Sequence, residues 1–232
     1  MVWNDGSKNI IGMHYKKPTP RNIPQTIILV NGDFPKHQLP LSIINRWIDG
    51  FGTLICCDGA VNKLQLYTDK LPDFVIGDLD SVDKTLKVRL GKRVISVEEQ
   101  DTNDMTKSVL FATGELRASD IIFLGISGGR EDHFFSNISL IAEYSDMANE
   151  IIAVTDSGYF RIVRNGDSIE THTGQQVSVF NFENTPISAT NLKWTLDNIV
   201  LKRIWSGSLN EATSDSISFS CHNPILVYVL NT

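Results

Sequence analysis

Short apolar segments recur through the first two thirds of this chain, and each one stops at glycine or a polar residue. Residues 53–57 are followed by Asp58, and residues 74–76 are followed by Gly77. Longer stretches with helical spacing of their apolar residues separate these segments. Strands that alternate with helices form a mainly parallel sheet that helices cover on both faces. The pattern therefore predicts an α/β domain over residues 1–155.

The individual elements of this domain follow from the same spacing. Further strands are expected at 25–30, 93–97, 121–124 and 151–155, and helices at 39–49, at 60–67 and from about 102 onward. In such a sheet, ligands bind beyond the carboxyl ends of the strands. Polar residues that directly follow a strand are therefore the candidates for a site.

The texture of the sequence changes after residue 155. Apolar residues now alternate with polar ones or are β-branched, and turns separate the runs about every ten residues. Strands are expected at 159–163, 176–182, 199–205, 216–220 and 225–230. The pattern is typical of a small all-β sandwich, which we expect to occupy residues 156–232.

Composition excludes several classes of function. The 232 residues are 41% hydrophobic and 21% charged, which is typical of globular proteins. A net charge of −6 offers no basic surface for nucleic acid. No apolar run approaches the roughly eighteen residues that a membrane span needs. Neither nucleic acid nor a membrane is therefore expected as a partner.

The cysteines and the start of the chain bear on its compartment. Residues 1–21 are polar and lack the apolar segment of a signal peptide. The three cysteines, two of them adjacent at Cys56 and Cys57, suit neither a disulfide framework nor a zinc site. They are better explained as small buried side chains in a reduced compartment. We therefore expect a cytoplasmic protein.

Four carboxylates lie in two clusters about twenty residues apart. Asp78 and Asp80 follow a predicted strand, and Asp101 and Asp104 precede Lys107. Acids gathered at one place repel each other unless a cation neutralises them. Oxygen ligands suit Mg²⁺, which usually brings substrate phosphates with it, and a lysine can contact such a phosphate. Two solvated acidic loops remain an alternative explanation of the spacing alone.

A glycine-rich turn follows the predicted strand at 121–124. Gly128 and Gly129 would let backbone N–H groups approach a phosphate, and Arg130 adds a planar fork suited to phosphate oxygens. The segment matches neither G-x-x-x-x-G-K-[ST] nor G-x-G-x-x-G. Like the first acidic cluster, it comes directly after a strand, which indicates one shared ligand site.

Taken together, these segments resemble the thiamine pyrophosphokinase family. Five motifs of that family occur in order between about residues 30 and 230. They are Asp58-Gly59-Ala60-Val61-Asn62, Gly77-Asp78-Leu79-Asp80-Ser81, Gln100 to Lys107, Gly128 to His133, and Asn191-Leu192-Lys193-Trp194-Thr195-Leu196. Each motif is modest alone, whereas five in order are specific.

The resemblance implies a reaction in which ATP and thiamine give AMP and thiamine diphosphate. Catalysis of that kind is mostly positioning and charge stabilisation. The catalytic, magnesium-holding positions of the family match Asp78, Asp80, Asp101 and Asp104. Its nucleotide-binding positions match Asp58, Lys107, Arg130, Asp132 and His133. One of the carboxylates would also accept the proton of the thiamine alcohol, and Asp80 and Asp104 are preferred.

The resemblance also implies how thiamine is held. Trp194 matches the family's thiamine-contacting tryptophan, and an indole face suits a cationic thiazolium ring; without the resemblance, a tryptophan in the core of the β domain would be the simpler explanation. Ser208 and Asn210 are further candidates for substrate binding. Leu209 departs from the family pattern, which often has a hydroxyl residue there. The family's sites lie between two subunits, so a homodimer with shared sites is expected.

Two other functions are compatible with parts of the pattern. The nearer one is another magnesium-dependent diphosphokinase that acts on a different heteroaromatic alcohol, such as a pterin. The further one is a non-catalytic module that binds a nucleotide or thiamine. The presence of all four acids together with Lys107 argues against such a module, because a sensor does not need a complete metal cluster.

Overall fold

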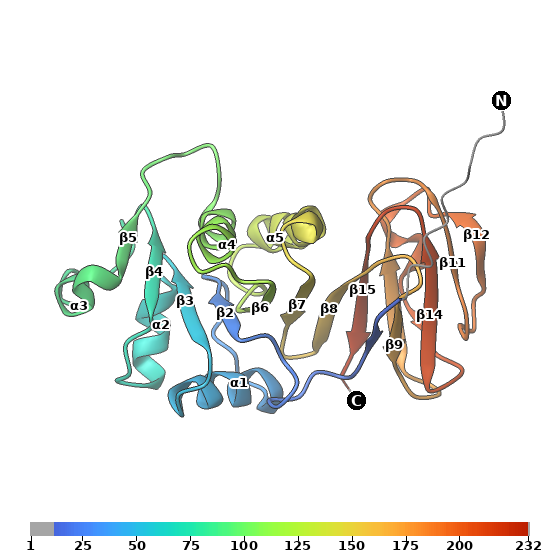
Figure 1. Cartoon of the computed structure of the whole chain (residues 1–232), viewed down its shortest axis with the longest axis horizontal. Coiled ribbons are helices and arrows are strands. Elements are labelled where there is room, and N and C mark those ends of the chain that lie inside the picture. The colour runs from blue at the N-terminus through green and yellow to red at the C-terminus, as the bar shows by residue number, and fades with distance from the viewer. Residues whose placement is uncertain (1–11, 232) are drawn as a thin grey trace. The chain divides into compact units, whose positions relative to one another are not determined.

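The computed structural model describes residues 12–231, which divide into two compact units (Figure 1). Residues 18–161 form the first, which we name the α/β unit. Residues 12–17 and 162–230 form the second, the β unit. The division therefore falls after residue 161, whereas the sequence predicts it after residue 155. Residues 1–11 and 232 of the two predicted domains lie outside the described residues.

The α/β unit contains a sheet in the order β8-β7-β6-β2-β3-β4-β5. Its strands are β2 (Thr26–Leu29), β3 (Thr53–Cys57), β4 (Phe74–Gly77), β5 (Val94–Ser96), β6 (Asp120–Leu124), β7 (Glu150–Val154) and β8 (Gly158–Val163). Strands β2 to β7 pair in parallel, and β8 adds an antiparallel pairing to β7. The prediction of a mainly parallel sheet is thus confirmed.

Burial on both faces explains why these strands are continuous apolar runs. Ile27 and Ile28 of β2 are fully buried, and so are Leu54 and Ile55 of β3. Neighbouring residues of a strand point to opposite faces, so both faces of the sheet must be covered. Figure 1 shows how this is done, with α1 and α2 on one side of the sheet and α4 and α5 on the other.

The helices of this unit are α1 (Gln38–Ile48), α2 (Ala60–Tyr67), α3 (Lys84–Leu90), α4 (Asp104–Gly114) and α5 (Glu131–Glu143), with short 3₁₀ turns at Gly91–Arg93 and Tyr144–Asp146. The helices predicted at 39–49 and 60–67 correspond to α1 and α2. The apolar pattern of the sequence does not predict α3, which buries only Leu86 and Leu90. The feature of the sequence that marks the start of α3 is Asp83. Its carboxylate caps the helix by accepting hydrogen bonds from the N–H groups of Thr85 and Leu86.

The β unit consists of strands in two sets. One is a five-stranded sheet in the order β1-β9-β14-β11-β12, and the other runs in the order β13-β10-β15. The bounds are β1 (His14–Tyr15), β9 (Ser168–Glu170), β10 (Gln176–Phe180), β11 (Pro186–Ala189), β12 (Leu196–Val200), β13 (Asn210–Glu211), β14 (Ser216–Cys221) and β15 (Ile225–Leu230). Residues 12–17 belong to this unit because β1 pairs in parallel with β9.

One predicted strand of the β unit is wrong. The strand expected at 199–205 is replaced by the end of β12 at Val200 and a 3₁₀ turn at Ile204–Gly207. Ile204 and Trp205 are 42% and 64% exposed. Their side chains therefore do not pack against a sheet, and residues with high β propensity form a strand only where such packing is available.

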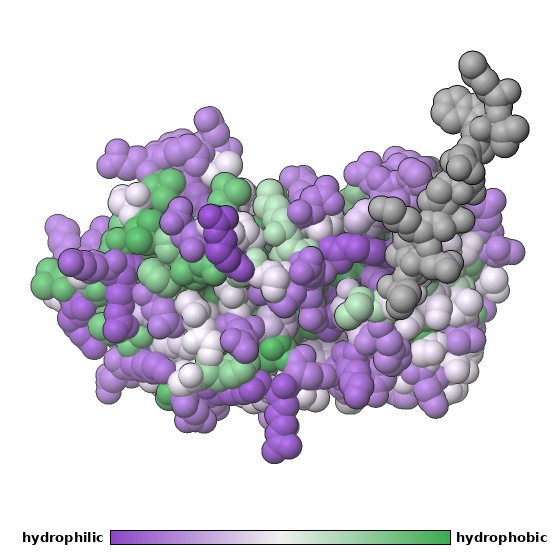
Figure 2. All heavy atoms as spheres, viewed as in Figure 1, coloured by the Kyte–Doolittle hydropathy of each residue, from purple (hydrophilic) through white to green (hydrophobic). Residues whose placement is uncertain are grey.

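The surface of the α/β unit is largely polar. Figure 2 shows that hydrophobic side chains on the visible face of this unit gather near β4 and α4. Leu110 of α4 and Phe135 of α5 are at least half exposed. Among residues 12–231, no helix is long and apolar enough to cross a membrane.

We predict that Asp73→Ala lowers the free energy of unfolding of the α/β unit by about 2–4 kcal/mol. The Asp73 carboxylate accepts hydrogen bonds from Trp47 Nε1 at 2.9 Å and from the N–H of Leu54 at 2.8 Å. Both residues are almost fully buried, so the substitution leaves two donors without an acceptor. Urea denaturation followed by circular dichroism measures the loss. Asp69→Ala, at an exposed carboxylate nearby, is the control; equal stability of the two variants would contradict the prediction.

Candidate active site

The pairing of β3 with β4 brings two acidic segments together. Cys57 lies beside Ile76 in the parallel register, and the N–H of Asp58 donates to the carbonyl of Ile76 at 2.8 Å. Asp58 therefore follows β3 at the edge of the sheet where β4 ends at Gly77 and is followed by Asp78. Its side chain is only 5% exposed. The sequence prediction that polar residues gather beyond these strand ends is met here.

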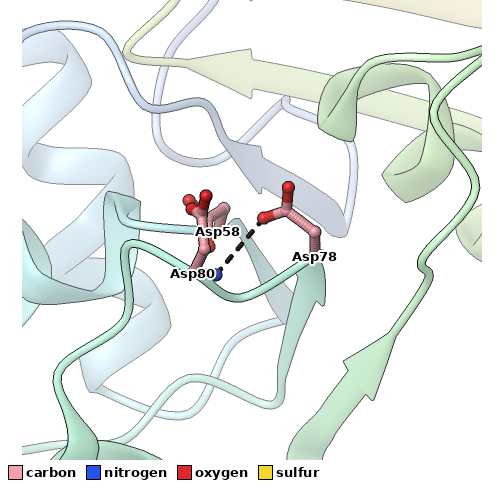
Figure 3. A group of neighbouring side chains, drawn as sticks. All are labelled: Asp58, Asp78 and Asp80. Carbon is pink, nitrogen blue, oxygen red and sulfur yellow. Dashed lines mark hydrogen bonds between the residues drawn. The ribbon is translucent and has the colours of Figure 1, made fainter.

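Asp58, Asp78 and Asp80 form a compact group of carboxylates (Figure 3). One oxygen from each lies within 4.8 Å of the others. Leu79 has a left-handed backbone, with φ of 67°, and is itself buried. This turn folds Asp80 back, so that its N–H donates to Asp78 Oδ1 at 3.3 Å. We name these three residues the carboxylate group.

Asp104, the first residue of α4, lies next to this group. A side chain at Gly77 would place its Cβ 2.9 Å from Asp58 Cβ and 3.1 Å from Asp104 Cγ, so both residues crowd the same glycine. Burial raises the pKa of the Asp104 carboxyl, and the charges of Asp58 and Asp78 raise it further. The ammonium of Lys107 opposes this shift from 3.5 Å.

A divalent cation fits these residues. Asp58 Oδ1 is buried and has no hydrogen-bond partner among the described residues. An unpaired carboxylate oxygen in that position costs free energy unless something else neutralises it. Three carboxylates that converge within reach of one ion, with Asp104 beside them, provide the oxygen ligands that Mg²⁺ prefers.

Two other predicted site residues, Asp101 and Lys107, lie outside the carboxylate group. Asp101 is exposed in the loop between β5 and α4, and it is not among the carboxylates within 4.8 Å of one another. Lys107 is only 6% exposed, and its ammonium faces Asp104. The Lys107 charge thus partly offsets the acidic residues. Asp58, which the family resemblance assigns to nucleotide binding, lies within the carboxylate group and also lines the cavity described below.

The glycine-rich turn after β6 packs against the loop that follows β2. The N–H groups of Gly32 and Asp33 donate to the carbonyls of Gly125 and Ser127, at 2.9 and 2.8 Å. A Cβ on Gly32 would lie 2.4 Å from both of these carbonyl oxygens, so only glycine permits the approach. From α2, Lys63 Nζ donates to the carbonyls of Asn31 and Gly32.

A cavity of about 610 Å³ lies among the loops that follow β2, β3 and β6. Its walls include both acidic and phosphate-binding candidates, namely Asp58, Asp104, Gly128, Gly129, Arg130 and His133. Asn31 and Gly32 also line it, although the sequence analysis did not assign them to the site. The signal was present, since they follow buried strand β2 just as Asp58 follows β3.

Arg130 is already paired. Its Nε and NH2 atoms donate to the two carboxylate oxygens of Asp132, at 3.1 and 2.6 Å. The hydrogen bonds from Arg130 hold the pKa of the Asp132 carboxyl below its usual range. Both side chains are mostly exposed. Asp132 thus orients the guanidinium at the edge of the cavity.

In the β unit, Trp194 is 56% exposed, so it is not a core tryptophan. The side chain of Asn210 is buried and forms hydrogen bonds with both the N–H and the carbonyl of Trp194. Asn210 Oδ1 accepts from the N–H of Trp194 at 3.1 Å, and Nδ2 donates to its carbonyl at 2.7 Å. Lys193 Nζ lies 5.0 Å from the centre of the indole ring. Asn210 therefore positions the tryptophan, whose ring is open to solvent.

Ser208 and Leu209 lie on the chain just before Asn210. Ser208 Oγ donates to the carbonyl of Trp205 at 2.7 Å. Leu209 is 71% exposed and has a left-handed backbone with φ of 57°. Trp205 and Leu209 thus add exposed apolar surface to the unit that carries Trp194.

Comparison with known proteins gives consistent results. Residues 45–155 match the family model for the thiamin pyrophosphokinase catalytic domain, and residues 158–228 match the model for the thiamin pyrophosphokinase substrate-binding domain. Thiamin pyrophosphokinase 1 of Caenorhabditis elegans is 25% identical over 178 residues, which cover 70% of this chain and 72% of the relative. Thiamine pyrophosphokinase 1 of rice (Oryza sativa subsp. japonica) is 26% identical over 174 residues, or 62% of this chain and 65% of the relative.

Solved structures show the same fold. Thiamin pyrophosphokinase from Candida albicans superimposes with a TM-score of 0.76 at 18% identity, over 95% of this chain and 93% of that protein. The yeast enzyme gives a TM-score of 0.73 at 20% identity, over 96% and 92% of the two chains.

We predict that Gly77→Ala destabilises the α/β unit by about 1–3 kcal/mol. The added methyl group would lie 2.9 Å from Asp58 Cβ, which is too close for two carbon atoms, and 3.1 Å from Asp104 Cγ, which is tight, so the backbone or the side chains must move. Gly114→Ala is the control, because nothing lies within 4 Å of a Cβ there and alanine suits the end of α4. Urea denaturation of both variants measures the difference. A Gly77→Ala variant as stable as the control would contradict the close approach.

Proposed function

The chain belongs to the thiamine pyrophosphokinase family, and we propose that it transfers the β,γ-diphosphoryl group of ATP to the hydroxyl group of thiamine. The products are AMP and thiamine diphosphate. The observation that carries this proposal is the carboxylate group beside a cavity that also contains the glycine-rich turn and Arg130. Negative and phosphate-binding groups belong together where a cation and a polyphosphate bind together.

Asp58, Asp78 and Asp80 would hold Mg²⁺, with Asp104 adjoining them. The unpaired oxygen of buried Asp58 supports this choice of ligands. When bound, the ion would neutralise negative charge on the ATP phosphates and so favour attack on the β-phosphorus. Asp101 remains a predicted ligand, from the loop that leads into α4.

The nucleotide phosphates would lie along the glycine-rich turn. Gly129 has open space around it, so the backbone there is accessible to a ligand. Arg130 would bind phosphate oxygens as a fork, with Asp132 as its orienting partner. His133 lines the same cavity. Lys107 contributes by holding Asp104 in place rather than by direct contact.

The alcohol of thiamine must lose its proton as it attacks, because a free hydroxyl group is a weak nucleophile. A carboxylate beside the reacting phosphate can accept that proton. Asp80 and Asp104 are the candidates. Asp80 is exposed, and Asp104, whose side chain is 31% exposed, lines the cavity.

Thiamine would stack on Trp194. The exposed indole suits a cationic heteroaromatic ring, by an attraction of about 0.5–2 kcal/mol. We propose a homodimer in which the β unit of one copy completes the site in the α/β unit of the other. Exposed Trp205 and Leu209 supply apolar surface for such an assembly. The three cysteines are free and buried, which favours a reduced compartment such as the cytoplasm.

Incubation with ATP, Mg²⁺ and thiamine tests the reaction. We expect AMP to appear in equal amount with thiamine diphosphate, because the β- and γ-phosphates move as one unit. Chromatography of both products measures this. Asp80→Asn is the matched control: a nearly isosteric amide should keep the fold but lower turnover at least about a hundredfold. ADP as the nucleotide product would make the protein a simple kinase and refute the proposal.

Subunit mixing tests the shared site. Asp80→Asn should fail in catalysis, and Trp194→Ala should weaken the use of thiamine while ATP binding stays nearly unchanged. Random exchange between the two homodimers makes half of the dimers mixed, and each mixed dimer contains one intact site. Activity should therefore recover to roughly a quarter of wild type. No recovery, with exchange verified by a mass tag on one variant, would mean that each site is built within a single chain.

A further inference from the structure

Asn62 of α2 makes two hydrogen bonds to the segment that follows the acidic turn. Its Nδ2 donates to the carbonyl of Ser81 at 2.7 Å, and its Oδ1 accepts from the N–H of Asp83 at 3.2 Å. One amide thus uses its donor and its acceptor at the same time. Neither bond belongs to the helix ladder or to the sheet.

These bonds attach the turn to another part of the unit. The other described hydrogen bonds made by residues 78–83 remain within that turn or lead into α3. The N–H of Val82 donates to the carbonyl of Leu79, and Ser81 Oγ donates to Asp80 Oδ1. Such local bonds shape the turn beyond the β3–β4 pairing, but they do not attach it to the segment that carries Asp58. The Asn62 amide makes that attachment, because Asn62 lies on the same segment as Asp58.

The link between Asp58 and Asn62 is short and rigid. The N–H of Val61 donates to the carbonyl of Asp58, and the N–H of Asn62 donates to the carbonyl of Gly59, so both ends lie on one helical turn. Gly59 lets the two segments approach, since a Cβ there would lie 3.1 Å from Ser81 Cβ. The Asn62 amide thus adds a direct side-chain restraint between the acidic turn and the segment that carries Asp58.

We propose that Asn62 is a positioning residue that holds the acidic turn, and with it Asp80, in place relative to Asp58 and thereby raises the affinity for the divalent cation. The inference rests on the proposed function, because it takes the carboxylate group as the cation site. The buried, unpaired Oδ1 of Asp58 supports that choice independently of any family resemblance. Groups that hold metal ligands in place typically change metal affinity 10- to 100-fold when they are removed.

Binding of Mn²⁺ alone to the full chain tests this directly, because Mn²⁺ takes the same oxygen ligands and its free fraction is measured by electron paramagnetic resonance. Asn62→Ala should raise the dissociation constant for Mn²⁺ about tenfold or more. In the AMP assay the same variant should show a lower kcat and a higher half-saturating Mg²⁺ concentration, with KM for thiamine unchanged. Alanine is a better helix former than asparagine, so α2 should persist.

Two further variants separate positioning from general stability. Gln65→Ala is the matched control, since Gln65 also donates from α2 to backbone carbonyls, those of Thr68 and Lys70, but away from the acidic turn. It should bind Mn²⁺ as wild type does. Asn62→Leu keeps the side-chain size, loses both hydrogen bonds, and should behave as Asn62→Ala does; it replaces that variant if the alanine protein does not fold.

The outcomes are distinct. Wild-type affinity for Mn²⁺ in the Asn62 variants, an equal loss in Gln65→Ala, or no Mn²⁺ binding by the wild-type chain would each overturn the inference. Failure of the wild-type chain to form AMP would instead refute the proposed function, while the Mn²⁺ measurements would still decide the role of Asn62.

Discussion

The parallel pairing of β3 with β4 is the constraint on which the site depends. It brings Asp58 beside Gly77 and Asp78, which come from another segment of the chain, and the N–H of Asp58 is held by the carbonyl of Ile76. The acids that converge there repel each other, and the buried ammonium of Lys107 offsets only part of that charge. A bound cation would therefore neutralise carboxylates that the backbone already holds together.

Much of this arrangement follows from local sequence. The runs that form β3 and β4 are apolar because both faces of the sheet are covered, and the residues just beyond them are polar because they meet solvent and ligands. Asp78 and Asp80 could therefore be assigned to a site. That Asp58 lies within the same carboxylate group could not be predicted, because this depends on β3 and β4 being neighbours in the sheet. Strand order is a property of the whole sheet, in which β2 lies between β3 and β6.

Other features depend on tertiary contacts that oppose local preference. Leu79 adopts a left-handed backbone that is unfavourable for leucine, and its burial compensates for this. Residues 199–205 have strand-forming composition, yet Trp205 remains exposed in a 3₁₀ turn. The hydrogen bonds of Asn210 to the backbone of Trp194 could not be predicted from the sequence either. In a sequence, an asparagine that binds the backbone cannot be distinguished from one that binds a ligand. In each case the deciding partner lies elsewhere in the fold.

The pairing of Arg130 with Asp132 has a consequence for selectivity. The guanidinium already has an anionic ligand from its own chain, held through two hydrogen bonds. These two bonds use Nε and one N–H of NH2, so NH1 and the second N–H of NH2 remain available to a phosphate oxygen. Because Asp132 already offsets the positive charge of Arg130, a small anion such as inorganic phosphate would be held weakly at this position. A polyphosphate that reaches several groups of the cavity at once would depend less on this one charge.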